Sequence, residues 1–152
     1  MNFPFSKILC PVGFDDQEVL ALEAARQLAG ESATIYLLHV VSALPAIGES
    51  NVAGTREDEK SSGSEALRRL EELAAQRLAG LKYETLTETA FLAATGKAIL
   101  TVAREIKPDL IVMPTHGRSG LARLVMGSVT ENVVREALCP VLTIRTSAGW
   151  IP

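Results

Sequence analysis

The residues best suited to chemistry lie in the stretch VMPTHGRSGLARLVMGSVTENVV, residues 112–134. Ser128, with Glu131 three residues later, has the S-x-x-E spacing of a helix capping box. A helix that begins here presents free amides and a partial positive charge, and both favour a phosphate. Gly127 lets a ligand approach the backbone, and the hydroxyls of Ser128 and Thr130 could donate hydrogen bonds. On these residues alone an ordinary capped helix is the more common meaning of the pattern, and a phosphate site is the alternative.

Other glycine-containing stretches are less informative. Thr95-Gly96-Lys97 is close to the end of a P-loop, but that pattern requires glycine where Phe91 stands and Ser or Thr where Ala98 stands. We therefore reject a P-loop. The turn that contains Gly117 and Arg118 offers a flexible backbone and one positive charge, which by themselves predict a surface loop.

The spacing of histidine and cysteine predicts no metal site. His39 and His116 have no Cys, His or acidic residue nearby at ligand spacing. We interpret His39 as a core histidine with satisfied hydrogen bonds, and His116 either contacts a ligand or stabilises its turn. Cys10 and Cys139 lack a CxxC motif and are interpreted as small buried hydrophobic residues. No GxSxG motif or nucleophile–base pair is present, so the sequence does not predict an efficient enzyme.

Composition narrows the possible partners and location. The 152 residues carry a formal net charge of −3, and no basic run is interleaved with aromatic residues. Binding to nucleic acid or to a membrane surface is therefore not expected. The first residues lack the pattern of a signal peptide, and no apolar segment approaches the roughly 20 residues that span a bilayer. We expect a cytoplasmic protein.

Five apolar runs of strand length alternate with four amphipathic segments. The predicted strands are residues 7–12, 33–41, 81–93, 109–113 and 141–144. The predicted helices run from a cap at Asp15 or Asp16 to a C-cap at Gly30, from 66 to near Gly80, from Gly96-Lys97 to Pro108, and from Ser128 to Leu138. This alternation predicts one α/β domain over residues 1–152, in which helices cover both faces of a parallel sheet. Ligands bind such sheets at the carboxyl ends of the strands, where the strand order reverses.

Two segments have no clear periodicity. Residues 44–64 are rich in glycine, serine and charge, and they predict either a solvated insertion or a flap beside a site. Residues 146–152 form a C-terminal tail.

Three segments carry a resemblance to a known family. They are KILCPVGFDDQEVLALEAARQLA near the start, YLLHVV in the second predicted strand, and DLIVMPTHGRSGLARLVMGSVTENVVREALCPVLTIR near the end. Over nearly its whole length the chain resembles the universal stress protein family, with its UspA-type domain. The resemblance implies a Rossmann-like open sheet of five parallel strands in the order 3-2-1-4-5. It also implies a homodimer joined through the last strand, around Val141 to Arg145.

The resemblance leaves open whether an ATP site is present, because the family divides into members that bind ATP and members that do not. ATP-binding members of the family show glycine, two residues, glycine, nine residues, then glycine followed by Ser or Thr. In this chain Gly117, Gly127 and Ser128 match, whereas Pro114 stands at the first glycine. The implied site residues are Pro11, Val12, Gly13, Val40, Met113, Pro114, Gly117, Gly127, Ser128, Val129 and Thr130.

Two of these positions depart from the family pattern. ATP-binding members usually carry Asp where this chain has Gly13, so a carboxylate that accepts hydrogen bonds from ribose is missing. Pro114 adds a ring and lacks an amide donor. We expect the phosphate end of the site to be retained and nucleotide binding to be weakened. The chain is therefore interpreted as a dimeric binding or regulatory module in stress response, with a weakened site for ATP and magnesium. The alternatives are a switch with slow ATP hydrolysis and a ligand-free interaction protein.

Overall fold

The computed structural model describes residues 4–15, 18–43, 56–115 and 127–145. The elements in chain order are β1 (Phe5–Pro11), α1 (Glu18–Leu28), β2 (Ala29–Ala43), α2 (Arg56–Arg77), β3 (Lys82–Phe91), a 3₁₀ turn (Leu92–Ala94), α3 (Thr95–Ile106), β4 (Leu110–Pro114), α4 (Ser128–Glu136) and β5 (Val141–Ile144). All strand pairs are parallel, and the sheet order is β3-β2-β1-β4-β5. This confirms the predicted α/β fold and its strand order.

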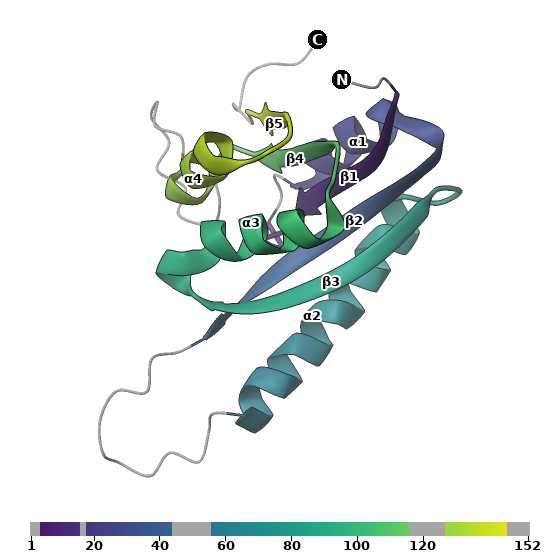
Figure 1. The fold of residues 1–152 in the computed structure, drawn as a ribbon. Helices are drawn as coiled ribbons and strands as arrows, with labels where there is room; N and C mark the ends of the chain where they lie inside the picture. Colours follow the sequence, from purple (N-terminus) through teal and green to yellow (C-terminus); the bar gives the residue numbers. More distant parts are fainter. Residues whose placement is uncertain (1–3, 16–17, 44–55, 116–126, 146–152) are drawn as a thin grey trace, which may run out of the picture.

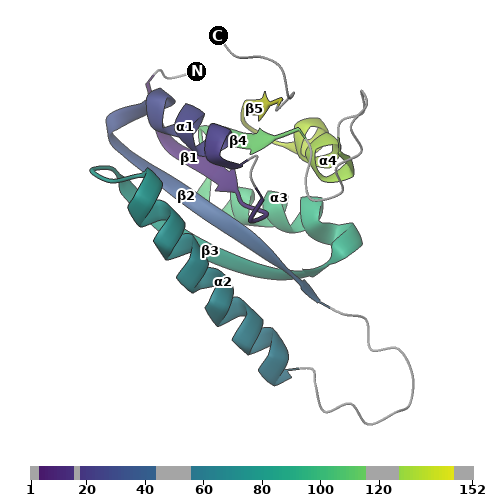
Figure 2. The same ribbon diagram turned by 180° about the vertical axis from the view of Figure 1, so that it is seen from behind.

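The helices form a layer on each side of the sheet. Helices α3 and α4 lie in front of it in Figure 1, and α1 and α2 cover the opposite face, which Figure 2 shows from behind. Strands β2 and β3 are long, and their pairing continues to Ala43 and Phe91, well beyond the end of β1. Strands β2 and β3 therefore extend farther than β1 at the carboxyl edge of the sheet.

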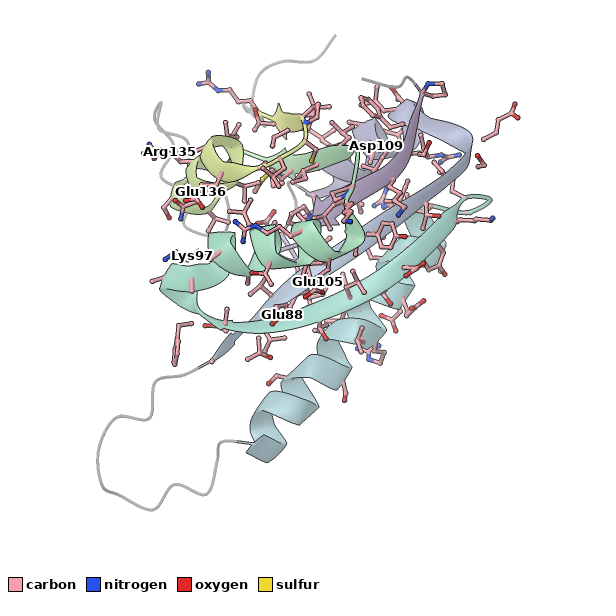
Figure 3. All side chains as sticks on the ribbon, viewed as in Figure 1. Glu88, Lys97, Glu105, Asp109, Arg135 and Glu136 are labelled. Atoms are coloured by element: carbon pink, nitrogen blue, oxygen red, sulfur yellow. The ribbon has the colours of Figure 1, made fainter. Side chains whose placement is uncertain are left out.

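Side-chain bonds fix the starts of β1 and β4 against each other. The Asp109 carboxylate accepts hydrogen bonds from the amides of Ser6 at 2.8 Å and Lys7 at 3.0 Å. The ammonium group of Lys7 donates to the carbonyl of Ile106 at the end of α3. Figure 3 shows Asp109 beside the start of β4 and Lys97 at the other end of α3. Polar contacts thus fix the amino edge of the sheet. A ligand site is therefore expected at the carboxyl edge.

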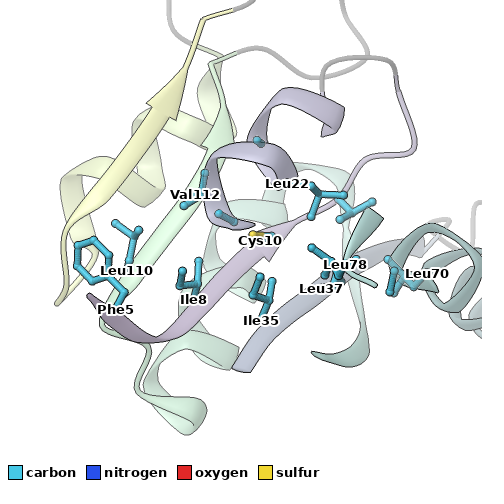
Figure 4. Packing of buried hydrophobic residues seen from close by; sticks show 14 residues of the cluster. Phe5, Ile8, Cys10, Leu22, Ile35, Leu37, Leu70, Leu78, Leu110 and Val112 are labelled. Carbon is cyan, nitrogen blue, oxygen red and sulfur yellow. The ribbon is translucent and has the colours of Figure 1, made fainter. Parts of the chain in front are cut away.

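Each face of the sheet has its own hydrophobic cluster. The cluster beneath α1 and α2 is drawn in Figure 4 and includes Ile8, Cys10, Leu22, Ile35, Leu70 and Val112. The cluster beneath α3 and α4 includes Leu9, Leu38, Ile99, Val102, Met113 and Val133. Burial raises the pKa of the Cys10 thiol to about 12, so this residue stays a neutral apolar group, as predicted. Cys139 is only half-buried.

One predicted helix boundary is wrong. Helix α1 ends at Leu28, and Gly30 lies inside β2 instead of forming a C-cap. A C-cap of that kind needs a left-handed φ, which among the described glycines belongs to Gly80, at 86° just after α2. Glycine at position 30 instead allows close packing, because a Cβ there would lie 3.2 Å from Cγ of Pro4.

Helix α2 is longer than the sequence pattern indicates. It begins at Arg56, so the part of the predicted 44–64 loop from residue 56 onward is wrong, whereas residues 44–55 and the 146–152 tail lie outside the described residues. Residues 56–65 contain no large apolar side chain, and hydrophobic periodicity therefore carried no signal there. Helix α2 is supported by Arg68, which pairs with Glu65 at i−3 and with Glu72 at i+4.

Candidate functional site

The strand order reverses between β1 and β4, and the region between the carboxyl ends of these two strands is called the crevice below. These strands pair only at Ile8–Leu110 and Leu9–Ile111. Beyond that point β1 stays with β2, where the amide of Val12 donates to the carbonyl of Leu38 at 2.8 Å. Strand β4 stays with β5 through Pro114. The strand order reverses here, which is where open α/β sheets bind ligands.

The start of α4 is attached to the end of β4. The amide of Gly127 donates to the carbonyl of Thr115 at 2.9 Å. The hydroxyl of Thr130, a residue only 3% exposed, donates to the carbonyl of Pro114 at 3.0 Å. These two bonds hold the N-terminus of α4 beside the crevice.

The predicted capping box at Ser128 and Glu131 is wrong. Gly127 occupies the N-cap position with φ −60° and ψ 148°, so Ser128 is already the first helical residue. The Glu131 carboxylate binds Arg135 at 2.5 Å instead of reaching back to the helix start. Within the described residues no side chain caps α4. The first amides of a helix have no partner inside it, and among the described residues no partner is found for those of Ser128 and Val129.

Pro114 alters the crevice without weakening the sheet. The amides of Ile111 and Thr115 point to β5, at 3.0 Å from the carbonyl of Pro140 and 2.9 Å from that of Ile144. By strand alternation the backbone nitrogen at position 114 faces the other way, toward β1, where pairing has already ended. The proline therefore removes a donor from the crevice and breaks no ladder bond.

The remaining predicted site residues are divided between the two faces of the sheet. Met113 is buried beneath α3 and α4, and the partly buried Val40 and Val129 pack against the same cluster. Val12 is buried in the opposite cluster, and Pro11 is half-buried at the end of β1. Gly13 follows Val12 in the segment after β1, and Gly117 lies outside the described residues. The described site residues of β1, β4 and α4 thus lie around the ends of β1 and β4, whereas Val40 lies farther along β2.

A buried carboxylate beside Gly13 was missed by the sequence reasoning. Glu18 is 3% exposed, and its Oε1 accepts a hydrogen bond from the amide of Asp15 at 2.5 Å. Burial raises the pKa of the Glu18 carboxyl to about 7, and the charge of Asp15 adds to the rise, whereas bonds from the Asp15 and Gly13 amides and the charge of Arg69 oppose it. The signal was present as D-x-x-E over residues 15–18, since the Glu18 contact is the reach-back half of a capping box. Asp16, the other predicted cap, lies outside the described residues.

Phe14 and His39 complete the loop after β1. Phe14 has a left-handed φ of 62°, which is uncommon for a residue with a side chain. Its ring lies 4.4 Å from that of His39, and the guanidinium carbon of Arg69 lies 4.0 Å from its centroid. Nδ1 of His39 lies 2.7 Å from the carbonyl of Val12, so this nitrogen must carry the proton. The interpretation of His39 as a histidine with satisfied hydrogen bonds is confirmed, although it is only half-buried.

The described residues contain neither a cluster of metal ligands nor a helix that could cross a membrane. Within residues 4–15, 18–43, 56–115 and 127–145, no three His, Cys, Asp or Glu side chains gather where they could hold a metal ion. No helix in those ranges has the length and apolarity needed to cross a bilayer.

Comparison with known proteins settles the family. The model of the universal stress protein family matches residues 4–145. The chain belongs to the universal stress protein family. The universal stress protein MJ0531 of Methanocaldococcus jannaschii is 32% identical over 145 residues, which cover 93% of this chain and 82% of the relative. The solved structure of MJ0577, from the same organism, is 25% identical with a TM-score of 0.76 and covers 95% of this chain and 98% of its own.

Two more distant structures of the family contain nucleotides. One is a universal stress protein in complex with cAMP, 24% identical with a TM-score of 0.63, over 95% of this chain and 99% of that one. The other is the Archaeoglobus fulgidus universal stress protein in complex with dAMP, 18% identical with a TM-score of 0.63, over 91% and 96%. At this identity the likeness to the present protein is one of fold.

Proposed function

We propose that this universal stress protein binds an adenine nucleotide weakly in the crevice between β1 and β4 and acts as a cytoplasmic binding or regulatory module in stress response. One observation carries the proposal: the N-terminus of α4 is attached to the end of β4, and no described side chain caps it. A helix N-terminus in this position suits the phosphates of a nucleotide. Relatives solved with cAMP and dAMP support an adenine nucleotide as the ligand class.

The phosphate end would consist of the amide and hydroxyl of Ser128 and the amide of Val129. Gly127 and Gly117 would let the phosphates approach the backbone closely. Thr130 has a different role in this proposal, because its hydroxyl proton is donated to Pro114. Magnesium would arrive with the ATP phosphates. We expect at most slow ATP hydrolysis, since no nucleophile–base pair accompanies these groups in the sequence.

The nucleoside end would be formed by Pro11, Val12, Val40 and Met113, which supply apolar surface. Gly13 offers no side chain to ribose, and Pro114 offers no amide. Losing two or three hydrogen bonds at roughly 0.5–1.5 kcal/mol each would weaken binding by about one to three powers of ten. ATP is therefore the favoured ligand over a nucleoside, because its phosphates use the intact end.

We also propose a homodimer joined through β5, from Val141 to Arg145. Strand β5 is at the edge of the sheet, with β4 as its single neighbour, and all four of its residues are half-buried. Leu138, just before it, is 90% exposed, and Val134 on α4 is 43% exposed. Pairing two such edges would satisfy open backbone groups and cover these apolar side chains. Sedimentation of the purified protein tests this: a monomer at micromolar concentration would contradict it.

The nucleotide proposal is tested by analysing small molecules released on denaturation, followed by calorimetric titration with ATP and magnesium. Ser128→Glu places a negative charge where a phosphate would bind, and we expect it to lower ATP affinity at least tenfold. The helix itself should not suffer, because an acidic residue in the first turn is favourable.

Ser32→Glu is the matched control, since it adds the same charge at an exposed position in the first part of β2. It should leave ATP affinity unchanged. Equal ATP affinities of the wild type, Ser128→Glu and Ser32→Glu would place the ligand elsewhere, and the absence of any binding would contradict the proposed function.

A further inference from the structure

The backbone that follows β1, residues 12–15, is held by the side chains of Glu18 and His39. Oε1 of Glu18 accepts the amide of Asp15 at 2.5 Å, and the amide of Gly13 also hydrogen-bonds to this carboxylate. His39 binds the carbonyl of Val12, the residue before Gly13, at 2.7 Å. The backbone leaving β1 is therefore oriented by Glu18 and by a partner on β2.

The Glu18 carboxylate also lies beside the space that a side chain at position 13 would enter. A Cβ built on Gly13 would lie 3.6 Å from Oε1 of Glu18 and 3.5 Å from Oδ2 of Asp15, and both are ordinary contact distances. Gly13 has no left-handed φ, so its backbone would accept a larger residue. A side chain at this position would therefore meet the carboxyl groups of Glu18 and Asp15.

We propose that Glu18 is the positioning residue for the nucleoside end of the site, because its buried carboxyl group orients the amides of Gly13 and Asp15. This inference rests on the proposed nucleotide function for its consequence in binding. Its structural part, the control of the β1–α1 loop by Glu18, does not depend on a ligand.

The charges around Glu18 give the loop a dependence on pH. Asp15 lies on the same loop, Arg69 faces the loop from α2, and His39 faces Phe14 from β2. The buried Glu18 carboxyl holds its proton up to about pH 7, whereas a solvent-exposed one loses it near 4.5. By linkage, raising the pH through 7 ionises the buried group and favours a loop in which the carboxylate reaches water.

Nuclear magnetic resonance tests the loop directly. In ¹⁵N-labelled wild-type protein, the amide signals of Gly13 and Asp15 should shift together with a midpoint at about pH 7. Glu18→Gln should remove that shared titration while the signals of Gly80, on a distant turn, stay unchanged. A titration that appears in both proteins belongs to a group other than Glu18. Gly13 and Asp15 signals that do not titrate, or that titrate equally in Glu18→Gln, would overturn the inference.

A charge-relocation cycle tests the binding consequence. Gly13→Asp adds a third carboxylate beside Glu18 and Asp15, so it should lower the denaturation midpoint and leave adenosine affinity unimproved. Gly13→Asp combined with Glu18→Gln should restore the midpoint and bind adenosine about tenfold more tightly than Gly13→Asp alone. Gly13→Ala is the matched control, because its methyl group fits without charge.

The outcomes separate the two proposals. Additive effects of Gly13→Asp and Glu18→Gln on the denaturation midpoint would overturn the role of Glu18, whether or not adenosine binds. If neither ATP nor adenosine binds to any variant while the amide titration and the non-additivity are observed, the nucleotide function fails and the control of the loop by Glu18 stands.

Discussion

The two ends of the candidate site differ in how their backbone amides are used. At the start of α4 the N-cap is Gly127, and no described side chain takes the first amides. In the β1–α1 loop the amides of Gly13 and Asp15 are taken by the buried Glu18 carboxylate. Among the described residues, the amides at the start of α4 have no partner, whereas those of the β1–α1 loop are bound by a side chain of the protein itself. From this difference we infer that the phosphate end keeps the family pattern, whereas the nucleoside end departs from it.

The largest expected effect is a loss of stability, caused by ionisation of Glu18 at the nucleoside end as the pH rises. Burial raises the folded pKa of Glu18 to about 7 from 4.5, which sets an upper limit of about 3 kcal/mol on the contribution of this group. Because the folded state holds the proton more tightly, this contribution to stability is present below about pH 4.5 and is lost as the pH rises to about 7. The free energy of unfolding, measured with urea at several pH values, should fall over that window in the wild type.

Glu18→Gln is the control for this measurement. It should show a flatter profile, and the difference between the two profiles cancels the contributions of the titrating groups that both proteins share. Parallel profiles would show that Glu18 is not perturbed in the folded state.

A smaller effect concerns the attachment of α4. Thr130→Val removes the buried bond to the carbonyl of Pro114 while keeping the side-chain shape, and it should lower the free energy of unfolding by about 1–2 kcal/mol. ATP affinity should fall as well, because the start of α4 is no longer held to β4.

Thr101→Val provides the comparison for Thr130→Val. Thr101 is exposed on α3, and its hydroxyl bonds only to the backbone carbonyl of Lys97 among the contacts resolved for it. This variant should change stability by less than about 0.5 kcal/mol and leave ATP affinity intact. Equal losses in the two variants would mean that the Thr130 bond does not hold the phosphate end.

The smallest expected effect comes from Arg69, which contacts the nucleoside end from α2. Arg69→Ala removes the cation above the Phe14 ring and should cost about 0.5–1 kcal/mol of stability. It should also raise the pKa of Glu18 further, since the positive charge of Arg69 lowers it. Arg77→Ala, at the end of the same helix, should do neither, and a carboxyl-detected titration of Glu18 in both variants distinguishes them.

Most of the fold followed from residue pattern because its elements bury regular apolar faces. Strand β5 was predicted with its observed bounds, Val141–Ile144, and the predicted inner face of α3 is confirmed at Ile99 and Val102. The polar first part of α2 could not be predicted in this way, because it contains no large apolar residue to show a period. Its helical state rests on helix-forming charged residues and on its continuity with the packed half.

The site was harder to predict because one local pattern has two outcomes. The spacing of a small polar residue and a glutamate occurs at residues 15–18 and again at 128–131. The glutamate reaches back in the first case, whereas in the second Gly127 takes the N-cap and Glu131 pairs with Arg135. A buried glutamate is rare, so burial of Glu18 could not be expected from its residue type. Tertiary packing of α1 against the sheet decides it.

The most direct test of the account compares ATP with inorganic tripolyphosphate. Both are titrated calorimetrically into the wild-type protein with magnesium, at one pH and one salt concentration. If the phosphate end supplies most of the binding, tripolyphosphate should bind within about tenfold of ATP, a difference of about 1.4 kcal/mol. Tight binding of ATP or adenosine with no detectable binding of tripolyphosphate would contradict the account, because the nucleoside end would then carry the affinity.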